Sequence, residues 1–248
     1  MWYYATPRVE FSSFKSWKAI GELYTPHYFL DQKDHQKLQI LFRQIKLSEQ
    51  TDTLTGIIDF VQNDIRYLGF EDGINAQKPM APATVIKQRF GDCKAKSFLL
   101  AELIKSLGYK AHPVLVNSYG GWTLNSEQPT PNLFNHCIVQ IVTDKGNYFV
   151  DPTLSNQGGN FSKRSIPQYE YGLVINGDNS ELIPLPGNAD SRIEYEETYS
   201  LDSIGKGANL HVITKYYGLE ADKVRSYFSN NNITNIQQEY LNLVLSRF

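Results

Sequence analysis

The segment from Asp92 to Gly108 constrains the fold of this 248-residue chain more than any other part of the sequence. Asp92 is a residue type that caps helix starts, and Gly108 supplies the left-handed position that often follows a helix end. Between them the apolar residues have helical spacing and form one broad face: Phe98, Leu99, Ala101, Leu103, Ile104 and Leu107. We therefore predict a helix over residues 93–107 that begins at Cys93.

Apolar spacing predicts the other elements. Helical spacing precedes this segment over residues 16–23, 34–45, 51–68 and 82–89. Strand-like runs follow it over residues 111–116, 136–142, 148–151, 173–175 and 182–183. Residues 193–201 and 209–217 alternate apolar and polar side chains, which predicts a hairpin with one solvent-exposed face, and helical residues follow. The order predicts an α+β fold in which N-terminal helices pack on an antiparallel sheet.

Composition excludes several classes of protein. With 24 basic and 26 acidic residues the net charge is −2, so the chain lacks the basic excess of nucleic-acid binding and we expect no nucleic-acid partner. No apolar run approaches the roughly 18–20 residues of a membrane span, and the mean hydropathy is −0.39. Cys93 and Cys137 are too few for a disulfide framework and lack zinc-site spacing. We expect no cofactor and no metal.

The segment Pro184–Gly187 marks a domain boundary by its composition. We predict one domain over residues 1–187, with a helical lead-in over 1–46, and part of a β-led domain over 188–248. The final helical pattern runs to Phe248 with no Gly, Pro or polar cap. We therefore expect this chain to be part of a longer protein.

Cys93 is a candidate nucleophile because of its position. A helix start carries partial positive charge and free N–H groups, which favour a thiolate over a thiol and can stabilise an oxyanion beside it. Lys94 and Lys96 add positive charge nearby. The alternative is a packing role, since free cysteine is among the most buried residue types.

His136 and Asp151 are the candidate partners of Cys93. Cysteine catalysis needs an imidazole to accept the proton and a third group to orient the imidazole. His136 opens one predicted strand and Asp151 ends the next, and neighbouring strands can place both on one face. A tight turn centred on Lys145–Gly146 would place Asp151 opposite Gln140. Gln140 lies four residues along the strand from His136, so at ~3.3 Å per residue Asp151 would be too far from His136 for contact. Only a bulge or another loop that shifts the register would bring them together.

Cys137 directly follows His136 in the sequence. Adjacent strand residues point to opposite faces, so Cys137 points away from Cys93 if His136 faces it. A Cys93–Cys137 disulfide and a Cys93–His136 pair are therefore competing possibilities. We favour Cys137 as a core residue.

These residues lie in a pattern that resembles the transglutaminase-like (papain-like) cysteine superfamily. The motifs that carry the resemblance are RFGDCK at 89–94, FLLAELI at 98–104, GYKA at 108–111, NH at 135–136 and VDPT at 150–153. The chain is similar to bacterial proteins that place this domain between an N-terminal β domain of unknown function, DUF3857, and a C-terminal β domain. The resemblance covers about residues 11–186 and is looser over KYYG at 215–218, Ala221 and Arg225.

The resemblance implies that Cys93 is a nucleophile, His136 its general base and Asp151 the group that orients the imidazole. It implies acyl chemistry through a thioester, with a peptide or protein amide as the substrate. Many relatives of this architecture are exported, which implies a periplasmic or exported location, although Met1–Tyr4 carries no signal pattern. The chain departs from the family pattern at two positions of the helix start. Ala95 stands where the family often has an acidic residue, and Lys94 stands where better-known transglutaminases often have Trp. They argue against protein crosslinking more than against acyl chemistry.

The sequence thus predicts a cysteine-dependent acyl-transfer enzyme, most simply a peptidase or amidase, with Cys93, His136 and Asp151 as its catalytic residues. The alternative is a non-catalytic binding or scaffold module that contacts a protein of the cell envelope, because a fold does not settle a function. A Cys93 sulfur beside His136, itself touching Asp151 at an open cleft, supports catalysis. A filled cleft supports binding.

Overall fold

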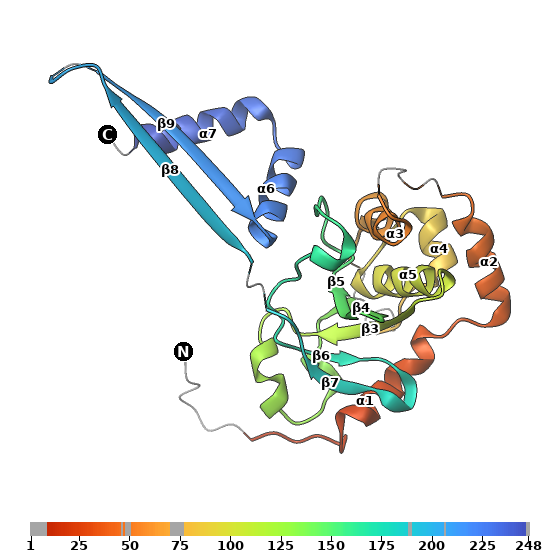
Figure 1. Cartoon of the computed structure of the whole chain (residues 1–248). Coiled ribbons are helices and arrows are strands. Elements are labelled where there is room, and N and C mark those ends of the chain that lie inside the picture. Colours follow the sequence, from red (N-terminus) through yellow and green to blue (C-terminus); the bar gives the residue numbers. More distant parts are fainter. Residues whose placement is uncertain are drawn as a thin grey trace.

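The computed structural model describes residues 9–45, 47, 51–69, 77–187, 190–205 and 207–246 of the chain. Its larger part is a five-stranded antiparallel sheet with helices packed against it, and its smaller part is a long hairpin followed by two helices (Figure 1). This arrangement confirms the α+β class predicted from the sequence. The chain ends, Met1–Tyr4 and Phe248, on which the expectations about a signal and a longer protein depend, lie outside the described residues.

The elements of the larger part follow one another in a simple order. Its α-helices are α1 (Trp17–Tyr24), α2 (Gln32–Phe42), α3 (Thr53–Asp59), α4 (Pro82–Gln88) and α5 (Cys93–Ser106). Its shorter helical turns are η1 (Thr25–Tyr28), η2 (Phe60–Asp64), η4 (Gly121–Ser126), η5 (Pro131–Leu133), η6 (Phe161–Lys163) and η7 (Gly177–Asn179). Its strands are β1 (Arg66–Tyr67), β2 (Phe90–Gly91), β3 (Lys110–Val116), β4 (His136–Thr143), β5 (Gly146–Val150), β6 (Tyr171–Val174) and β7 (Glu181–Pro184). The central sheet has the order β5-β4-β3-β6-β7, and β1 pairs in parallel with β2 beside it.

The start of α5 is fixed by local interactions. The helix begins at Cys93, as the sequence predicts. Oδ1 of Asp92 accepts a hydrogen bond from the backbone N–H of Ala95 at 2.8 Å, which satisfies one of the unpaired donors of a helix start. Gly91, just before the cap, belongs to β2 and pairs with Tyr67 of β1. The strand and the cap together hold Cys93 in place.

The two faces of the central sheet are covered by different kinds of structure. Leu115 and Val139 pack in clusters with residues of α1 and α3–α5. On the opposite face, Val114 and Ile138 pack with loop residues such as Tyr169. The assignment follows the alternation of side chains along a strand. Helices therefore support one face of the sheet, whereas connecting segments cover the other.

The helix predicted over residues 51–68 is shorter than expected. It continues from α3 only through the π-helical turn η2, and the next residues form β1. The Nζ of Lys96 donates to the backbone oxygens of Gln62 at 3.3 Å and Ile65 at 2.6 Å. The N–H of Arg66 donates to the oxygen of Arg89 at 2.8 Å. Because these partners come from other segments, they replace the bonds that a continued helix would make to itself.

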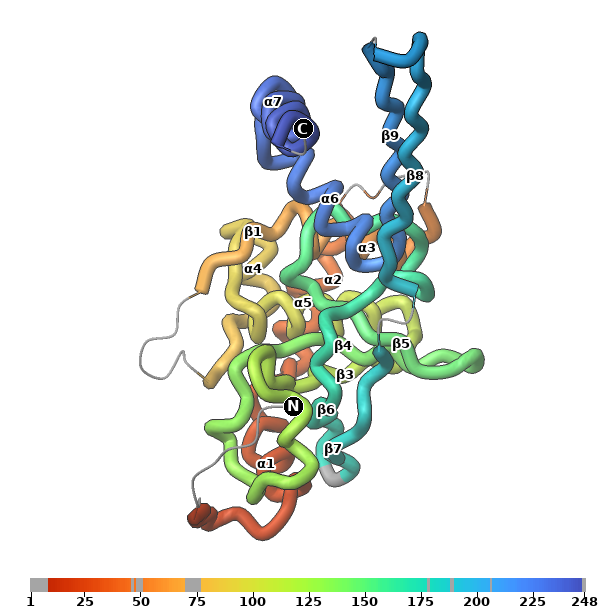
Figure 2. The backbone as a smooth tube through the Cα atoms, turned by 90° about the vertical axis from the view of Figure 1, so that its left-hand side faces the viewer, coloured from red at the N-terminus to blue at the C-terminus, as the bar shows by residue number. Residues whose placement is uncertain are grey.

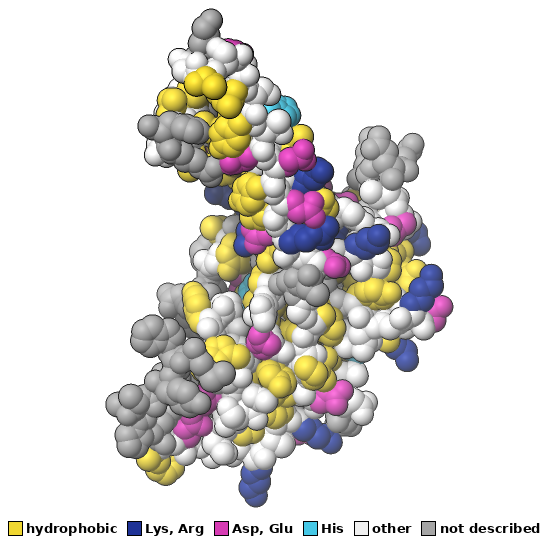
Figure 3. Space-filling model, turned by 60° about the vertical axis from the view of Figure 1, so that its left-hand side comes forward, with side chains coloured by type: hydrophobic (Ala, Val, Ile, Leu, Met, Phe, Trp, Pro, Cys, Tyr) yellow, Lys and Arg dark blue, Asp and Glu magenta, His cyan; other side chains and the backbone are white. Residues whose placement is uncertain are grey.

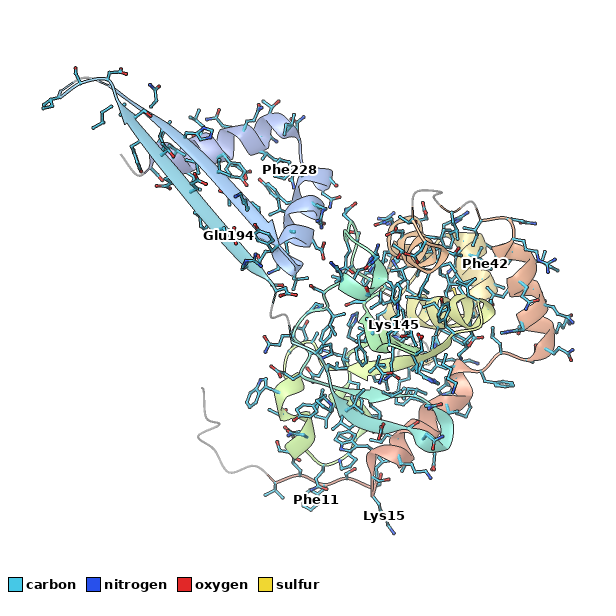
Figure 4. The ribbon with its side chains drawn as sticks, viewed as in Figure 1. Phe11, Lys15, Phe42, Lys145, Glu194 and Phe228 are labelled. Carbon is cyan, nitrogen blue, oxygen red and sulfur yellow. The ribbon has the colours of Figure 1, made fainter. Side chains whose placement is uncertain are left out.

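After residue 187 the chain forms β8 (Arg192–Leu201), β9 (Ala208–Tyr217), α6 (Leu219–Asn230) and α7 (Ile233–Leu245). The hairpin projects away from the central sheet (Figures 1 and 2). All ten residues of β8 are exposed, so the prediction of a hairpin with one buried face is wrong for this strand. Hydrophobic side chains are visible on this part of the surface (Figure 3). Phe228 on α6 is an exposed hydrophobic residue of this part, and Figure 4 labels it together with Glu194 on β8.

Gly21 provides a test of how α1 packs. A Cβ added at Gly21 would lie 2.0 Å from the Cβ of Ser180, closer than real contacts allow. We expect Gly21→Ala to lower the free energy of unfolding by about 1–3 kcal/mol, the usual cost of overpacking. Denaturant-induced unfolding measures the change.

Gly56→Ala in α3 is the matched control. The nearest heavy atoms to a Cβ added there lie 3.4 Å away, an ordinary contact distance. The gain in helix propensity, up to ~1 kcal/mol, is then the main effect. Equal losses of stability in the two variants would contradict the close approach of α1 to Ser180.

Candidate active site

The three residues predicted to form a catalytic site lie at the ends of neighbouring elements. Cys93 is the first residue of α5, His136 is the first residue of β4, and Asp151 follows the last residue of β5. Since β4 and β5 are adjacent antiparallel strands, the start of β4 lies beside the end of β5. Helix α5 packs against β4, which brings its first residue toward the same corner of the sheet.

The register of this hairpin differs from the predicted one. Gln140 pairs with Phe149 and not with Asp151, because the turn consists of the two residues Asp144–Lys145. The shift moves Asp151 toward the start of β4. His136 Nε2 then lies 2.9 Å from Asp151 Oδ2, so the contact that the predicted register excludes is made without a bulge.

Asp151 is a buried carboxylate that accepts several hydrogen bonds. It is 1% exposed. Oδ2 accepts from the His136 ring and from the Tyr169 hydroxyl, the latter at 2.6 Å, and Oδ1 accepts from the N–H and the hydroxyl of Thr153 at 2.8 and 2.7 Å. Burial alone would raise the pKa of Asp151, but the hydrogen bond and charge of His136 and the other donors hold that pKa below its ordinary value. The carboxylate therefore stays ionised at neutral pH.

His136 contacts Asp151 and lines the same pocket as Cys93. Burial alone would lower the pKa of its ring, but hydrogen bonds to Asp151 and Cys93, together with their charges, raise that pKa to about 10. Because Nε2 is bound to Asp151, Nδ1 is the ring nitrogen left for the thiol. The imidazole thus carries its proton at neutral pH and presents positive charge to the sulfur.

Cys93 and His136 line a pocket of about 220 Å³. Its other lining residues are Tyr24, Gln77, Lys94, Leu115, Phe134 and Asn135. A larger cavity, of about 600 Å³, lies where β5 and η6 meet the base of the β8–β9 hairpin. None of the three candidate residues lines that cavity, so size does not identify the site here, and the smaller pocket is the one that reaches the thiol.

The two lysines that follow Cys93 have different environments. Lys94 lines the pocket, and its Nζ lies 2.6 Å from Oδ2 of Asp92. Lys96 is 1% exposed and points into the interior. Burial lowers its pKa to about 8, although the negative charge of Asp151 acts to raise that pKa. Only Lys94 therefore adds positive charge to the pocket itself, contrary to the expectation for Lys96.

Cys137 is a buried free thiol, and Cys93 is also free. Cys137 packs in the same hydrophobic cluster as Cys93, so it does not turn away from that residue as expected. Its sulfur lies 3.5 Å from the hydroxyl of Tyr28. Burial, and then the charge of Cys93, raise the pKa of Cys137 to about 12. The thiol therefore stays protonated, which agrees with a core role.

Three residues that hold Asp151 were not identified from the sequence: Tyr169, Thr153 and Gln62. The Thr153 contact has a local signal, because an Asp side chain commonly bonds the N–H two residues on. Tyr169 comes from the segment before β6, and its backbone oxygen would lie 1.9 Å from a Cβ at Gly121. No spacing in the sequence marks Tyr169 or Gln62.

The described residues contain neither a metal-binding cluster nor a membrane-spanning helix. No group of three or more His, Cys, Asp or Glu side chains in that part of the chain is placed to hold a metal ion. No helix there has both the length and the apolar composition needed to cross a membrane. One histidine outside the site, His35, faces Glu102 at 3.5 Å.

Comparison with known proteins found similarity to solved structures. No family model matches the chain, and no curated protein matches it. A structure named as a candidate protease from Parabacteroides distasonis ATCC 8503 is 11% identical, with a TM-score of 0.49, over 86% of this chain and 56% of that one. A candidate cysteine protease from Cytophaga hutchinsonii is 14% identical, with a TM-score of 0.36, over 78% and 55%. The chain thus matches little more than half the length of either protein.

The His136 ring offers a direct test of the site. Its pKa of about 10 predicts a ring that keeps its proton through neutral pH. Asp151→Asn removes the buried negative charge, so we expect the pKa of His136 to fall. Histidine-ring NMR over about pH 5–10 measures this titration. Asp144→Asn, in the exposed turn, is the matched control, and equal titrations in the two variants would contradict the Asp151–His136 pair.

The same pKa predicts how stability depends on pH. Because folding raises the pKa of His136 above its ordinary value of 6.5, the stability contributed by its protonation is complete below about pH 6.5. It is lost as the pH rises toward 10. We expect the wild-type advantage in unfolding free energy over His136→Gln to shrink across this range. An advantage that grows with pH would show that the ring is neutral in the folded protein.

Proposed function

We propose that this chain is a cysteine-dependent acyl-transfer enzyme that acts as a peptidase or amidase through a thioester on Cys93. The observation that carries the proposal is the position of His136, which hydrogen-bonds Asp151 and lines the same pocket as Cys93. The resemblance to the transglutaminase-like cysteine superfamily implies the same three roles. We propose residues 1–187 as the domain that carries them.

The first half of the reaction forms the thioester. The protonated His136 ring favours the thiolate of Cys93, which attacks the carbonyl carbon of an amide and forms a C–S bond. The positive end of the α5 dipole favours the oxyanion that develops. His136 then donates its Nδ1 proton to the amide nitrogen as the C–N bond breaks, and the amine leaves.

The second half releases the acyl group. The neutral His136 ring accepts a proton from water, whose oxygen attacks the thioester carbon. The C–S bond breaks, so the Cys93 thiolate, the protonated ring and a carboxylic acid are formed. Asp151 keeps Nε2–H bonded throughout, which holds Nδ1 toward the sulfur. An amine in place of water would give acyl transfer with the same residues.

The pH dependence of alkylation tests the thiolate–imidazolium pair. An ordinary thiol, with a pKa of about 8.5, is less than about one per cent ionised at pH 6. We expect iodoacetamide to modify Cys93 rapidly at pH 6, and His136→Ala to slow this reaction by about tenfold or more because the positive charge is lost. Mass spectrometry of the modified peptides measures the rates.

Cys137→Ala is the matched control for alkylation. Its thiol is buried and stays protonated, so removing it should leave the modification rate of Cys93 unchanged. An alkylation profile that is the same in wild type and His136→Ala would show that His136 does not activate the thiol. It would contradict the proposed mechanism.

A non-catalytic binding module is the second candidate, favoured by the small exposure of Cys93, 3%. Incubation with a mixture of peptides distinguishes the two functions. An enzyme accumulates a hydroxylamine-sensitive acyl adduct on Cys93 and gives turnover that Cys93→Ala lowers by about 10³-fold or more. Peptide binding that is equal in wild type and Cys93→Ala, with neither adduct nor turnover, would establish the binding module instead.

A further inference from the structure

Helix α6 contacts the central domain through a buried carboxylate. Asp222 lies in the first turn of α6 and is 8% exposed. Its Oδ2 accepts a hydrogen bond from Nε2 of Gln157 at 2.9 Å, and its Oδ1 accepts from the N–H of Gly158 at 3.1 Å. Arg225, one turn later, pairs with the same carboxylate. Buried acidic side chains are rare unless paired, so this is a specific contact between α6 and the domain that holds the candidate site.

The contact is also closely packed. A Cβ added at Gly158 would lie 2.6 Å from the Cζ of Arg225, so the guanidinium group occupies the space that a side chain would need. Gln157 is 7% exposed. Helix α6 lies nearer the central domain than α7 does in both views (Figures 1 and 2). The Asp222 carboxylate and the Gln157 amide that binds it are therefore both buried.

Two glutamines connect this contact to the candidate active site. Nε2 of Gln62 donates to Oε1 of Gln157 at 2.8 Å. The same nitrogen donates to the backbone oxygen of Asp151, also at 2.8 Å. Gln62 is 3% exposed. A continuous chain of hydrogen bonds thus runs from Asp222 to the residue that orients His136.

The chain has a fixed direction. An ionised carboxylate only accepts hydrogen bonds, so Gln157 must turn its NH₂ group toward Asp222 and its oxygen toward Gln62. The second N–H of Gln157 donates to the oxygen of Ser165 at 2.8 Å. The oxygen of Gln62 accepts from Arg164 Nη1 at 2.5 Å, which leaves its NH₂ group for Gln157 and Asp151. Asp222 therefore fixes the orientation of the Gln157 amide, and Arg164 fixes the orientation of the Gln62 amide.

We propose that Asp222 is a positioning residue for the candidate active site, so that α6 completes the site from outside the domain that carries Cys93. The proposal rests on the proposed function, because its effect is exerted on Asp151 and through it on His136. Without the carboxylate, the Gln157 amide loses the acceptor that defines its orientation. The Gln62 donor then loses its fixed partner, and the backbone at Asp151 is held less firmly.

Alkylation of Cys93 at pH 6 in the full chain tests this role. We expect Asp222→Ala to lower the rate by about tenfold, because small displacements of catalytic groups are costly. The titrating groups around His136, namely Cys93, Asp151 and Tyr169, are unchanged in this variant. Asp222→Asn keeps one acceptor oxygen for the three donors Gln157, Gly158 and Arg225, so we expect an intermediate rate.

Glu220→Gln is the matched control. Glu220 lies two residues earlier on α6, carries the same charge, and pairs with Lys223 at 2.7 Å on the exposed side. We expect its alkylation rate to equal that of wild type. Gln157→Ala and the double variant Gln157→Ala/Asp222→Ala complete a double-mutant cycle. If the two residues act through one relay, the loss of alkylation rate in the double variant is smaller than the two single losses combined. Fully additive losses would overturn the relay.

Denaturant unfolding of each variant separates positioning from stability. If Asp222 has a purely structural role, Asp222→Ala lowers the unfolding midpoint but leaves the pH profile of Cys93 alkylation as in wild type. That result would overturn the inference about Asp222 and leave the proposed function standing. An ordinary alkaline profile in wild type would overturn the proposed function and the inference with it. Both proposals are supported if Cys93 of the wild type is alkylated at low pH, and if Asp222→Ala shifts this pH profile. Asp222→Asn should then shift the profile less, and Glu220→Gln should leave it unchanged.

Discussion

The buried negative charge of Asp151 is the constraint on which the rest of the site depends. An ionised carboxylate out of contact with water is strongly destabilising unless donors surround it. His136, Tyr169 and Thr153 supply those donors, each from a different segment of the chain. The strand register, the path of the segment before β6 and the raised pKa of the imidazole therefore all reflect the need to hold one charge in the interior.

Features governed by short-range physics could be predicted from the sequence. The start of α5 depends on the Asp92 side chain and the backbone three residues later, so residue type and spacing were sufficient. The first residue of β4 and the end of β5 follow from strand patterning, which placed His136 and Asp151 at neighbouring strand ends. Local signals thus identified these elements and placed the three candidate residues at their ends.

Features governed by distant partners could not be predicted. The register of the β4–β5 hairpin depends on which two residues form its turn, and both choices keep His136 and Asp151 on one face. The predicted helix over 51–68 ends early because Lys96, over thirty residues later, donates to its last carbonyls. Gln62, which donates to Asp151, lies in that π-helical turn, and periodicity carries no signal for the turn.

The two faces of the central sheet are covered by different kinds of structure. This separates two properties that usually change together, the stability of the domain and the surroundings of the His136 imidazole. The helical face contains the start of α5 and most of the buried apolar residues, so it carries the stability of the domain. The other face is closed by connecting segments, including the one that brings Tyr169 to Asp151. Loops tolerate substitution and length change better than packed helices. Variation in those segments could therefore retune the surroundings of the imidazole across related sequences while the helical core stays the same.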